Sequence, residues 1–465
     1  MTDEALRASF RDPSGFVFER DGSIYRQVNR VYAEDYDRLM ASGLYAELVE
    51  QKLLLAHEEV PSPLPDAGDA YRTLRPERVD FISYPYEWCF SQLKDAALAT
   101  LRVQQAALRH GMVLRDASAY NVQFLRGRPV FIDTLSFARY EEGAPWVGYR
   151  QFCQHFLAPL ALVAHRDARL LQLLRVHMDG IPLDLARALL PPRAWLNLHL
   201  LLHIRVHAGY QRRYEGDTDA ASKVRRISKR SLSNLVSALE SATKKLHWKA
   251  EGTAWAGYYD GDSYEVAAAE QKRALVAEHL DEIAPSVLWD LGANTGVFSR
   301  IAAERGVETL AFDVDPACVD HNYRQVRKDG ETRLLPLLLD LTSPSPALGW
   351  AAEERDSIVD RSSADAVMAL ALIHHLAISN NVPLGRIAAF LARLAGDLII
   401  EFVPKSDPKV AVLLATREDV FPDYTEAGFE AAFGTLFDIE RKTRLEGSER
   451  TLYRMRRRAL PTSTA

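Results

Sequence analysis

The feature that most constrains the fold is an alternation of strand-like and helical segments between about residues 254 and 458. In order, the apolar segments read VLWDLG, TLAFDVD, LLPLLLDL, ADAVMALALIHHL, DLIIEFVP, FDIERKT and RTLYRMRR, with helical patterns between most of them. This alternation predicts an α/β domain with a mainly parallel sheet and helices on both faces. We expect the last two segments to form an antiparallel hairpin at the edge of that sheet.

The chain is long enough for more than one domain. Its 465 residues, 48% of them hydrophobic, exceed the size at which a single core stops growing. We expect an N-terminal α+β domain over residues 1–148 and a mainly helical region over 149–250 that continues it and links onward. The α/β domain then occupies residues 251–465.

Charge and cysteine content exclude several classes of protein. The net charge of −6, with 26% charged residues, argues against disorder and against a dedicated nucleic-acid binder. Cys89, Cys153 and Cys318 lie far apart without CxxC spacing, so we expect neither a disulfide framework nor a bound metal. No stretch resembles a signal peptide or a membrane helix. We therefore expect a cytoplasmic protein without a membrane partner, whose oligomeric state the sequence leaves open.

Local patterns predict three elements in the N-terminal region. Residues 15–28 alternate apolar and polar side chains around Asp21-Gly22, which predicts a hairpin. Leucines at helical spacing predict one helix from Glu34 to Glu59, ended by prolines from Pro61 onward. A second helix is expected over residues 92–110, before Gly111.

A glycine-containing turn follows the first strand of the α/β domain. Asp290 to Gly296 reads DLGANTG and leads directly into a helical pattern. Such a turn lets the backbone approach a ligand closely. The spacing is GxNxG, and Val297 stands where a dinucleotide fingerprint has its third glycine, which disfavours NAD.

Acidic residues end the next two strands. Asp313 closes TLAFDVD, and Asp340 precedes Leu341 after LLPLLL. A carboxylate at such a position can accept hydrogen bonds from the ribose of a nucleotide, and Asp315 is the less suitable partner. The alternative is that Asp313 and Asp340 only cap helices or turns.

Together these residues resemble the D/E-x-G-x-G-x-G motif and strand-end acids of class I methyltransferases that use S-adenosylmethionine (SAM). Asn294 replaces the middle glycine, and asparagine tolerates left-handed backbone angles. The resemblance implies a Rossmann-like seven-stranded sheet with SAM as cofactor. It implies that Gly292, Asn294 and Gly296 pack against the methionine and ribose, and that Asp290 holds the methionine amino group. It further implies that Asp313 binds the ribose hydroxyls, and that Asp340, with Leu341 beside it, reaches the adenine amine.

The candidate catalytic residues follow the fourth and fifth strands. Many SAM methyltransferases have a similar His-His-Leu segment, here His374-His375-Leu376, near the transferable methyl group. A histidine there can act as general base or only fill the cleft. Glu401 can orient the acceptor or its base, or it can be a buried carboxylate paired with Lys405 or an arginine. Tyr258, Tyr259 and Tyr264 either cover the cofactor or simply pack.

The full chain also resembles bacterial SAM methyltransferases described as nodulation-protein-like. The resemblance lies in the opening FRDPSG and in the segments LDLTSPSPALGW and LALIHHLAISNNVPL. It does not carry a substrate with it, because function resides in the site rather than in the fold.

The N-terminal region contains a second pattern, MVLRDASAYNVQFLRGRPVFID. Asp116, Asn121 and Asp133 in it resemble the D-x-x-x-x-N segment and following Asp of kinase-fold phosphotransferases. There Asp116 would accept a hydroxyl proton, and Asn121 with Asp133 would hold magnesium. A glycine-rich phosphate loop is missing, and Lys52 and Lys94 fall on predicted helices. The region is a kinase-like fold without catalysis, an active phosphotransferase, or a chance Asx-turn before a hairpin.

We therefore expect a SAM-dependent methyltransferase whose N-terminal region aids acceptor recognition. The alternatives are a bifunctional protein with an active N-terminal phosphotransferase, and a non-catalytic SAM-binding scaffold. The acidic charge balance favours a small-molecule or glycan acceptor over nucleic acid.

Overall fold

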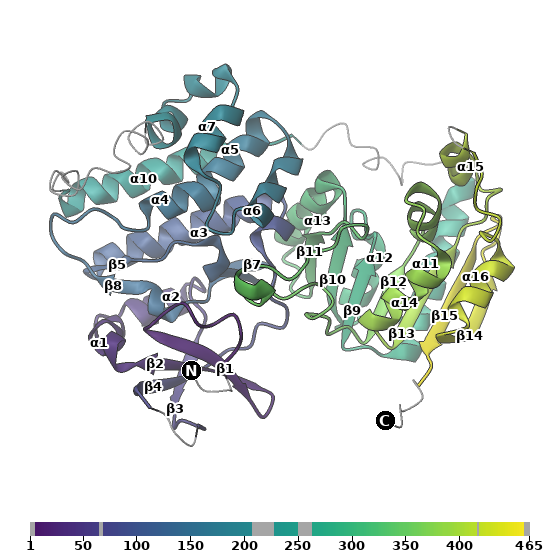
Figure 1. Ribbon diagram of the computed structural model, residues 1–465, viewed down its shortest axis with the longest axis horizontal. Coiled ribbons are helices and arrows are strands. Elements are labelled where there is room, and N and C mark those ends of the chain that lie inside the picture. Colours follow the sequence, from purple (N-terminus) through teal and green to yellow (C-terminus); the bar gives the residue numbers. More distant parts are fainter. Residues whose placement is uncertain (1–4, 65–67, 207–226, 250–262, 416–417, 460–465) are drawn as a thin grey trace. The chain divides into compact units, whose positions relative to one another are not determined.

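The computed structural model describes residues 5–64, 68–206, 227–249, 263–415 and 418–459. The chain divides into two compact units (Figure 1). Unit 1 comprises Met1–Lys249 together with Leu348–Arg355, and unit 2 comprises Ala250–Ala347 and Asp356–Ala465. The region expected over 149–250 thus falls almost wholly in the same unit as the N-terminal sheet.

Unit 1 opens with a four-stranded antiparallel sheet in the order β1-β2-β4-β3. Its strands are β1 (Gly15–Arg20), β2 (Ser23–Asn29), β3 (His57–Val60) and β4 (Ala70–Pro76). The predicted hairpin is confirmed: Asp21 and Gly22 have φ of 50° and 72° between β1 and β2. Positive φ at both turn residues matches the twist of the two strands.

The single helix predicted from Glu34 to Glu59 is wrong. The chain forms α1 (Ala33–Ala41) and α2 (Leu44–Glu50), and residues 57–60 form β3 instead. Gly43 separates the helices with a φ of 81°, a left-handed conformation that glycine adopts without steric cost. His57 to Val60 pair with β4, so strand pairing overrides the helical spacing of the preceding leucines.

The rest of unit 1 packs around a long helix, α3 (Phe90–Arg109), at the expected position. Two small antiparallel two-stranded sheets follow, β5 (Met112–Leu114) with β8 (Phe137–Arg139) and the hairpin of β6 (Val122–Leu125) with β7 (Arg128–Phe131). The other α-helices among the described residues of this unit are α4 (Tyr149–Phe152), α5 (Ala158–His165), α6 (Leu173–Val176), α7 (Leu183–Leu189), α8 (Leu198–Leu200) and α10 (Lys229–Lys245). As expected, this part of the chain is mainly helical.

Unit 2 contains a seven-stranded sheet in the order β11-β10-β9-β12-β13-β15-β14. The strands are β9 (Val287–Leu291), β10 (Glu308–Asp313), β11 (Leu334–Leu338), β12 (Ala366–Ala369), β13 (Asp397–Phe402), β14 (Phe437–Arg444) and β15 (Thr451–Arg457). The first five are parallel and β15 runs antiparallel between β13 and β14. This is the Rossmann-like sheet of class I methyltransferases, as the sequence predicts. The expected final hairpin forms, with β14 alone at the edge.

Helices cover both faces of this sheet (Figure 1). They are α11 (Ser263–Ile283), α12 (Val297–Ala303), α13 (Pro316–Asp329), α14 (Leu384–Leu394), α15 (Pro408–Leu414) and α16 (Glu426–Phe433). Leu288 of β9, Met368 of β12 and Ile399 of β13 pack with Val276 and Leu280 of α11 in one apolar core. This rigid core sets the positions at which the parallel strands end.

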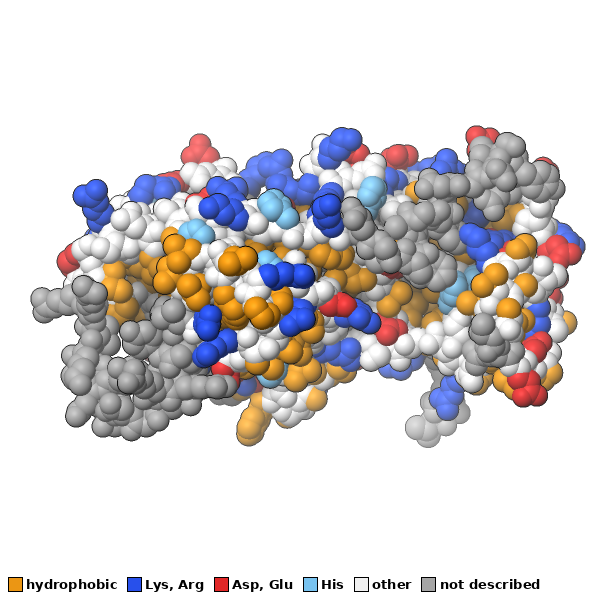
Figure 2. All heavy atoms as spheres, turned by 90° about the horizontal axis from the view of Figure 1, so that it is seen from above, with side chains coloured by type: hydrophobic (Ala, Val, Ile, Leu, Met, Phe, Trp, Pro, Cys, Tyr) orange, Lys and Arg blue, Asp and Glu red, His pale blue; other side chains and the backbone are white. Residues whose placement is uncertain are grey.

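Cationic side chains are distributed over the face shown in Figure 2, with apolar groups and some carboxylates between them. Among the described residues, no helix is long and apolar enough to cross a membrane.

Candidate functional site

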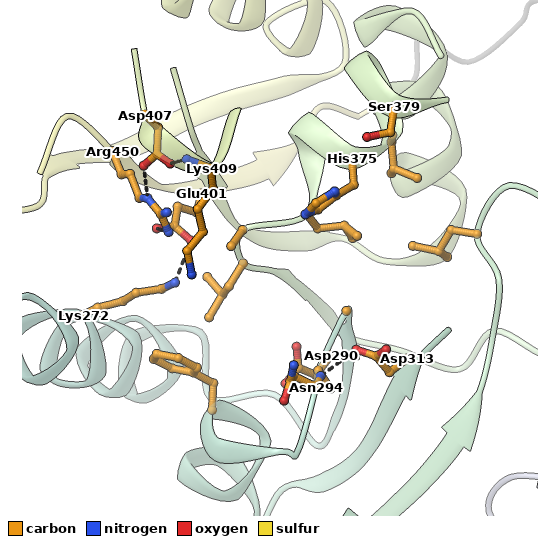
Figure 3. A pocket seen from close by; sticks show the side chains of 18 of the residues that line it. Lys272, Asp290, Asn294, Asp313, His375, Ser379, Glu401, Asp407, Lys409 and Arg450 are labelled. Carbon is orange, nitrogen blue, oxygen red and sulfur yellow. Dashed lines mark hydrogen bonds and ion pairs between the residues drawn. The ribbon is translucent and has the colours of Figure 1, made fainter. Parts of the chain in front are cut away.

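A cavity of about 1230 Å³ opens at the carboxyl ends of the parallel strands of unit 2. Ligands bind at this edge in open α/β sheets. Eight sequence-predicted site residues line it: Asp290, Gly292, Asn294, Asp313, Asp340, Leu341, His375 and Glu401. Gly296 and His374 do not. Figure 3 shows Asp290, Asn294 and Asp313 on one side, and His375 and Ser379 on another.

The turn after β9 has the backbone conformation that its sequence requires. Gly292, Asn294 and Gly296 have φ of 78°, 51° and 79°. A Cβ on Gly292 would lie 3.2 Å from the Leu372 side chain, and one on Gly296 would lie 2.5 Å from the Asn322 side chain. Gly296 therefore serves the turn and the packing of α12 rather than the cavity wall.

Asp290, at the end of β9, is almost fully buried. Its Oδ2 accepts a hydrogen bond of 2.6 Å from the Ser299 hydroxyl on α12. Burial raises the pKa of Asp290 to about 7, and the nearby Asp313 charge adds to the shift. A cationic ligand beside this buried carboxyl group would stabilise its ionised form, because a nearby positive charge favours ionisation.

Asp313, at the end of β10, stabilises the same turn. Its Oδ2 accepts the Asn294 N–H at 2.7 Å and its Oδ1 accepts the Asp315 N–H at 2.8 Å. Burial raises its pKa as well. Asp315 instead caps α13, accepting the Ala317 N–H at 2.8 Å. Asp313 therefore faces the cavity, and Asp315 has a structural role.

Asp340 lies in the loop after β11 and is exposed. Its Oδ1 accepts hydrogen bonds from the Thr342 N–H (2.8 Å) and from the Thr342 hydroxyl (2.6 Å), while Leu341 lines the cavity beside it. Asp340 therefore caps its own turn, as the alternative interpretation expected. It also lines the same cavity as Asp313, which ends the neighbouring strand.

The two adjacent histidines differ in position. His375 lines the cavity, whereas His374 is buried behind it, with ring centroids 4.1 Å apart. Burial lowers the pKa of His374 to about 3. Burial, with the Lys409 charge, also lowers the pKa of His375. A neutral His375 ring at the cavity wall can accept a proton, and His374 has no access to a substrate there.

Glu401 belongs to a buried ionic network. Lys272 Nζ of α11 lies 2.6 Å from Glu401 Oε2, and Arg450 Nη1 lies 3.6 Å from Oε1. Arg450 Nε also donates to Asp407 Oδ2 at 2.7 Å. Burial alone would raise the pKa of Glu401, but Lys272 and Arg450 hold it below the ordinary value. Of the expected partners, the arginine is present and Lys405 is not; Lys405 pairs with Asp419.

Sequence reasoning missed Lys272, Asp407 and Arg450, all of which line the cavity. They come from α11, the start of α15 and the start of β15, and no sequence spacing links them to Glu401. Figure 3 shows Lys272 and Arg450 converging on Glu401. Asn380 lines the cavity and donates to the His375 carbonyl at 2.8 Å. Tyr258, Tyr259 and the side chain of Tyr264 lie outside the described residues.

In unit 1 the structure brings the kinase-like residues together. Asn121 and Asp133 both contribute to the surroundings of Asp116, whose pKa is raised mainly by burial. A cation that sequence reasoning missed also lies there: Arg26 Nη2 of β2 is 2.6 Å from Asp133 Oδ1. The kinase resemblance lacked a lysine on a strand, and this arginine is on one.

Residues 348–355, which follow the loop after β11 in sequence, belong to unit 1. Arg11 Nε donates to Glu354 Oε1 at 2.9 Å, and the Arg355 guanidinium lies 4.3 Å from the centre of the Tyr120 ring. Tyr120 immediately precedes Asn121 in the kinase-like segment. The segment that resembled the nodulation-protein-like group is thus partly a component of unit 1.

No protein-family model matches the chain. The nodulation protein NoeA of Rhizobium meliloti (strain 1021) is 38% identical over 459 residues, which cover 97% of this chain and 96% of that protein.

Three solved structures give weaker matches. The bifunctional kinase-methyltransferase WbdD is 16% identical, covering 46% of this chain and 44% of that one, with a TM-score of 0.30. The magnesium protoporphyrin IX methyltransferase of Synechocystis is 18% identical (41% and 84% covered, TM-score 0.30). The methyltransferase domain of bacterial CtHen1 is 17% identical (41% and 100% covered, TM-score 0.31).

The strand order β11-β10-β9-β12-β13-β15-β14 of unit 2, with β15 antiparallel between β13 and β14, is that of the class I methyltransferase sheet. The match to NoeA spans 97% of the chain and therefore extends over both units. The chain belongs to the family of the nodulation protein NoeA, and its second unit has the fold of a class I methyltransferase.

Proposed function

We propose that this protein is a SAM-dependent methyltransferase. The observation that supports this most strongly is that Asp290, Asp313 and Asp340 reach one cavity beside a left-handed Gly/Asn turn. Asp290 would bind the methionine ammonium, Asp313 the ribose hydroxyls and Asp340 the adenine amine. The residues fit this cofactor because Asp290, with its pKa raised to about 7 by burial, is stabilised as a carboxylate by a cationic ligand.

The protein's part in catalysis is alignment and the removal of one proton. SAM supplies an electrophilic methyl group on a sulfonium, so little acid–base assistance is needed for a nucleophilic acceptor. For a hydroxyl acceptor, His375 is the candidate base, since it lines the cavity and its lowered pKa keeps the ring neutral near pH 7. His374 supports the His375 ring from behind.

Glu401 is a positioning residue in this proposal. Its ion pairs with Lys272 and Arg450 connect α11, β13 and β15 around the acceptor side of the cavity. A carboxylate held ionised by two cations is a weak base, so it is unsuited to deprotonate a hydroxyl.

We further propose a small-molecule or glycan acceptor. The cavity is lined by hydroxyl and amide side chains, Ser379, Asn380, Ser406 and Ser448, besides the ion pairs around Glu401. These groups suit an acceptor rich in hydrogen-bonding groups. A net charge of −6 gives no general attraction for a polyanion such as nucleic acid.

Calorimetry tests the cofactor site. Gly292→Val and Asp313→Ala should each abolish measurable SAM binding, because the first blocks the close backbone approach and the second removes the ribose acceptor and the brace of the turn. Glu304→Ala, at an exposed position of the same unit, is the control and should bind as the wild type does. Unchanged affinity in both site variants would refute the proposal.

Turnover is tested with methyl-labelled SAM and fractionated cell extract. We expect label to appear in a product with the wild type and not with Asp313→Ala. SAM binding without label transfer to any fraction would instead favour the scaffold alternative.

A further inference from the structure

Asp133, one of the kinase-like residues of unit 1, forms an ion pair with an arginine. Arg26 and Asp133 side chains are 18% and 12% exposed, and their closest N–O distance is 2.6 Å. Arg26 lies on β2, in the middle of the N-terminal sheet, and Asp133 follows β7. The pair therefore connects the sheet to the segment that carries Asp116 and Asn121.

The remaining bonding capacity of Asp133 is directed at its own loop. Oδ1 also accepts the Leu135 N–H at 3.1 Å, and Oδ2 accepts a short hydrogen bond from the Ser136 hydroxyl. Asn121 Nδ2 donates to Ser136 Oγ at 3.2 Å. In the kinase pattern Asn121 and Asp133 hold magnesium, but here Asn121 contacts Ser136, and Asp133 contacts Ser136 and Arg26.

The Arg26 guanidinium supplies a positive charge beside Asp133 without a metal. Asp116 and Asp133 are close enough for the charge of Asp133 to add to the burial that raises the pKa of Asp116. One guanidinium offsets part of this repulsion and is permanently protonated. A divalent cation at Asp133 would have to displace Arg26, which would leave a largely buried guanidinium unpaired at substantial cost.

The turn between β1 and β2 also differs from the phosphate-covering loop of a kinase-fold phosphotransferase. The connection between β1 and β2 consists only of Asp21 and Gly22, a tight hairpin turn rather than a loop able to cover phosphates. We propose that the Arg26 guanidinium takes the place of a divalent cation at Asp133, so that this centre is maintained without metal and does not transfer phosphoryl groups.

Manganese binding to the full-length protein, followed by electron paramagnetic resonance, tests the exchange of cations directly. The Mn²⁺ signal should be the same for the wild type and for Asp133→Asn, because Asp133 is not a metal ligand while Arg26 is present. Arg26→Ala should gain a site in the millimolar range or tighter, and the double variant with Asp133→Asn should lose it again. Arg72→Ala is the matched control on the same sheet, since Arg72 pairs with Glu59 but is 42% exposed; it should gain no site.

Thermal denaturation gives a second readout. Wild-type Tm should be the same in MgCl2 and in EDTA, whereas Arg26→Ala should lose on the order of 5 °C and recover part of it with MgCl2 but not with KCl of equal ionic strength. Arg26→Lys, which keeps the charge, stays informative if Arg26→Ala does not fold: it should bind no Mn²⁺. γ-Phosphate release from MgATP should be equal in wild type and Asp116→Ala.

Several results would overturn the proposal. They are Mn²⁺ binding or a magnesium-dependent Tm in the wild type that Asp133→Asn removes, a folded Arg26→Ala that gains no site, or MgATP turnover that depends on Asp116.

Discussion

Lys272 and Glu401 form an ion pair of 2.6 Å that joins α11 to the end of β13, with the Lys272 side chain 11% exposed and that of Glu401 fully buried. The Lys272 ammonium also lies 4.8 Å from the centre of the Phe298 ring at the start of α12. The pair therefore connects α11, the start of α12 and the end of β13 at the wall of the cavity.

Breaking this pair should destabilise unit 2 strongly. Lys272→Met leaves Glu401 buried with only the more distant Arg450, so the free energy of unfolding should fall by about 3–5 kcal/mol. Lys442→Met, which breaks exposed pairs with Glu426 and Glu430, is the control and should cost about 0–1 kcal/mol. Urea denaturation measures both, and equal losses would show that burial does not set the strength of the Lys272 pair.

SAM affinity should increase with pH through neutrality. Asp290 has a pKa of about 7 instead of the usual 3.8 because it is buried, so it is protonated in much of the ligand-free protein below pH 7. Only the carboxylate pairs with the methionine ammonium. Affinity should therefore rise about fivefold from about pH 6 to about pH 7 and then level off, because the α-amino group of the ligand itself loses its proton near pH 8. Calorimetry across this range measures it, and Asp290→Asn should bind weakly without that pH dependence.

His375 should carry the proton transfer and His374 should not. His375→Ala should lower kcat by about 10²–10⁴-fold for a hydroxyl acceptor, with SAM affinity unchanged. His374→Gln should have a much smaller effect. Because burial lowers the pKa of His375 below 6.5, the acidic limb of the kcat profile at saturating SAM should have its midpoint below that value. Equal losses of kcat in both variants would contradict this division of roles.

Substitutions at Gly296 and Gly306 should distinguish the cost of backbone strain from the cost of a steric clash. Both have left-handed φ, 79° and 85°, but an added Cβ meets Asn322 at 2.5 Å at Gly296 and nothing within 4 Å at Gly306. Gly306→Ala should cost about 1 kcal/mol from backbone strain alone. Gly296→Ala should cost on the order of 3 kcal/mol because Asn322 must move. Chemical denaturation measures the difference, and equal costs would show that α13 yields readily.

The sheet of unit 2 was predictable because its information is local. Each strand is a short apolar run, and the Gly-Ala-Asn-Thr-Gly turn places at Gly292, Asn294 and Gly296, where φ is positive, the residue types that adopt left-handed angles most readily. The prediction of a single helix over residues 34–59 was wrong because the outcome there depends on contacts remote in sequence. The leucine spacing there is helical, but Gly43 and pairing of His57 with β4, remote in sequence, decide the outcome.

The sequence alone determined the α/β class of unit 2, the glycine-containing turn after β9 and the acidic residues at the strand ends, because parallel strands bring their carboxyl ends to one edge. Only the tertiary structure decided that His375 and not His374 faces the cavity, and that Glu401 pairs with Lys272 and Arg450. It also decided that Arg26 neutralises Asp133. These partners are separated by up to 129 residues, and burial and charge pairing depend on how elements pack, which residue spacing does not encode.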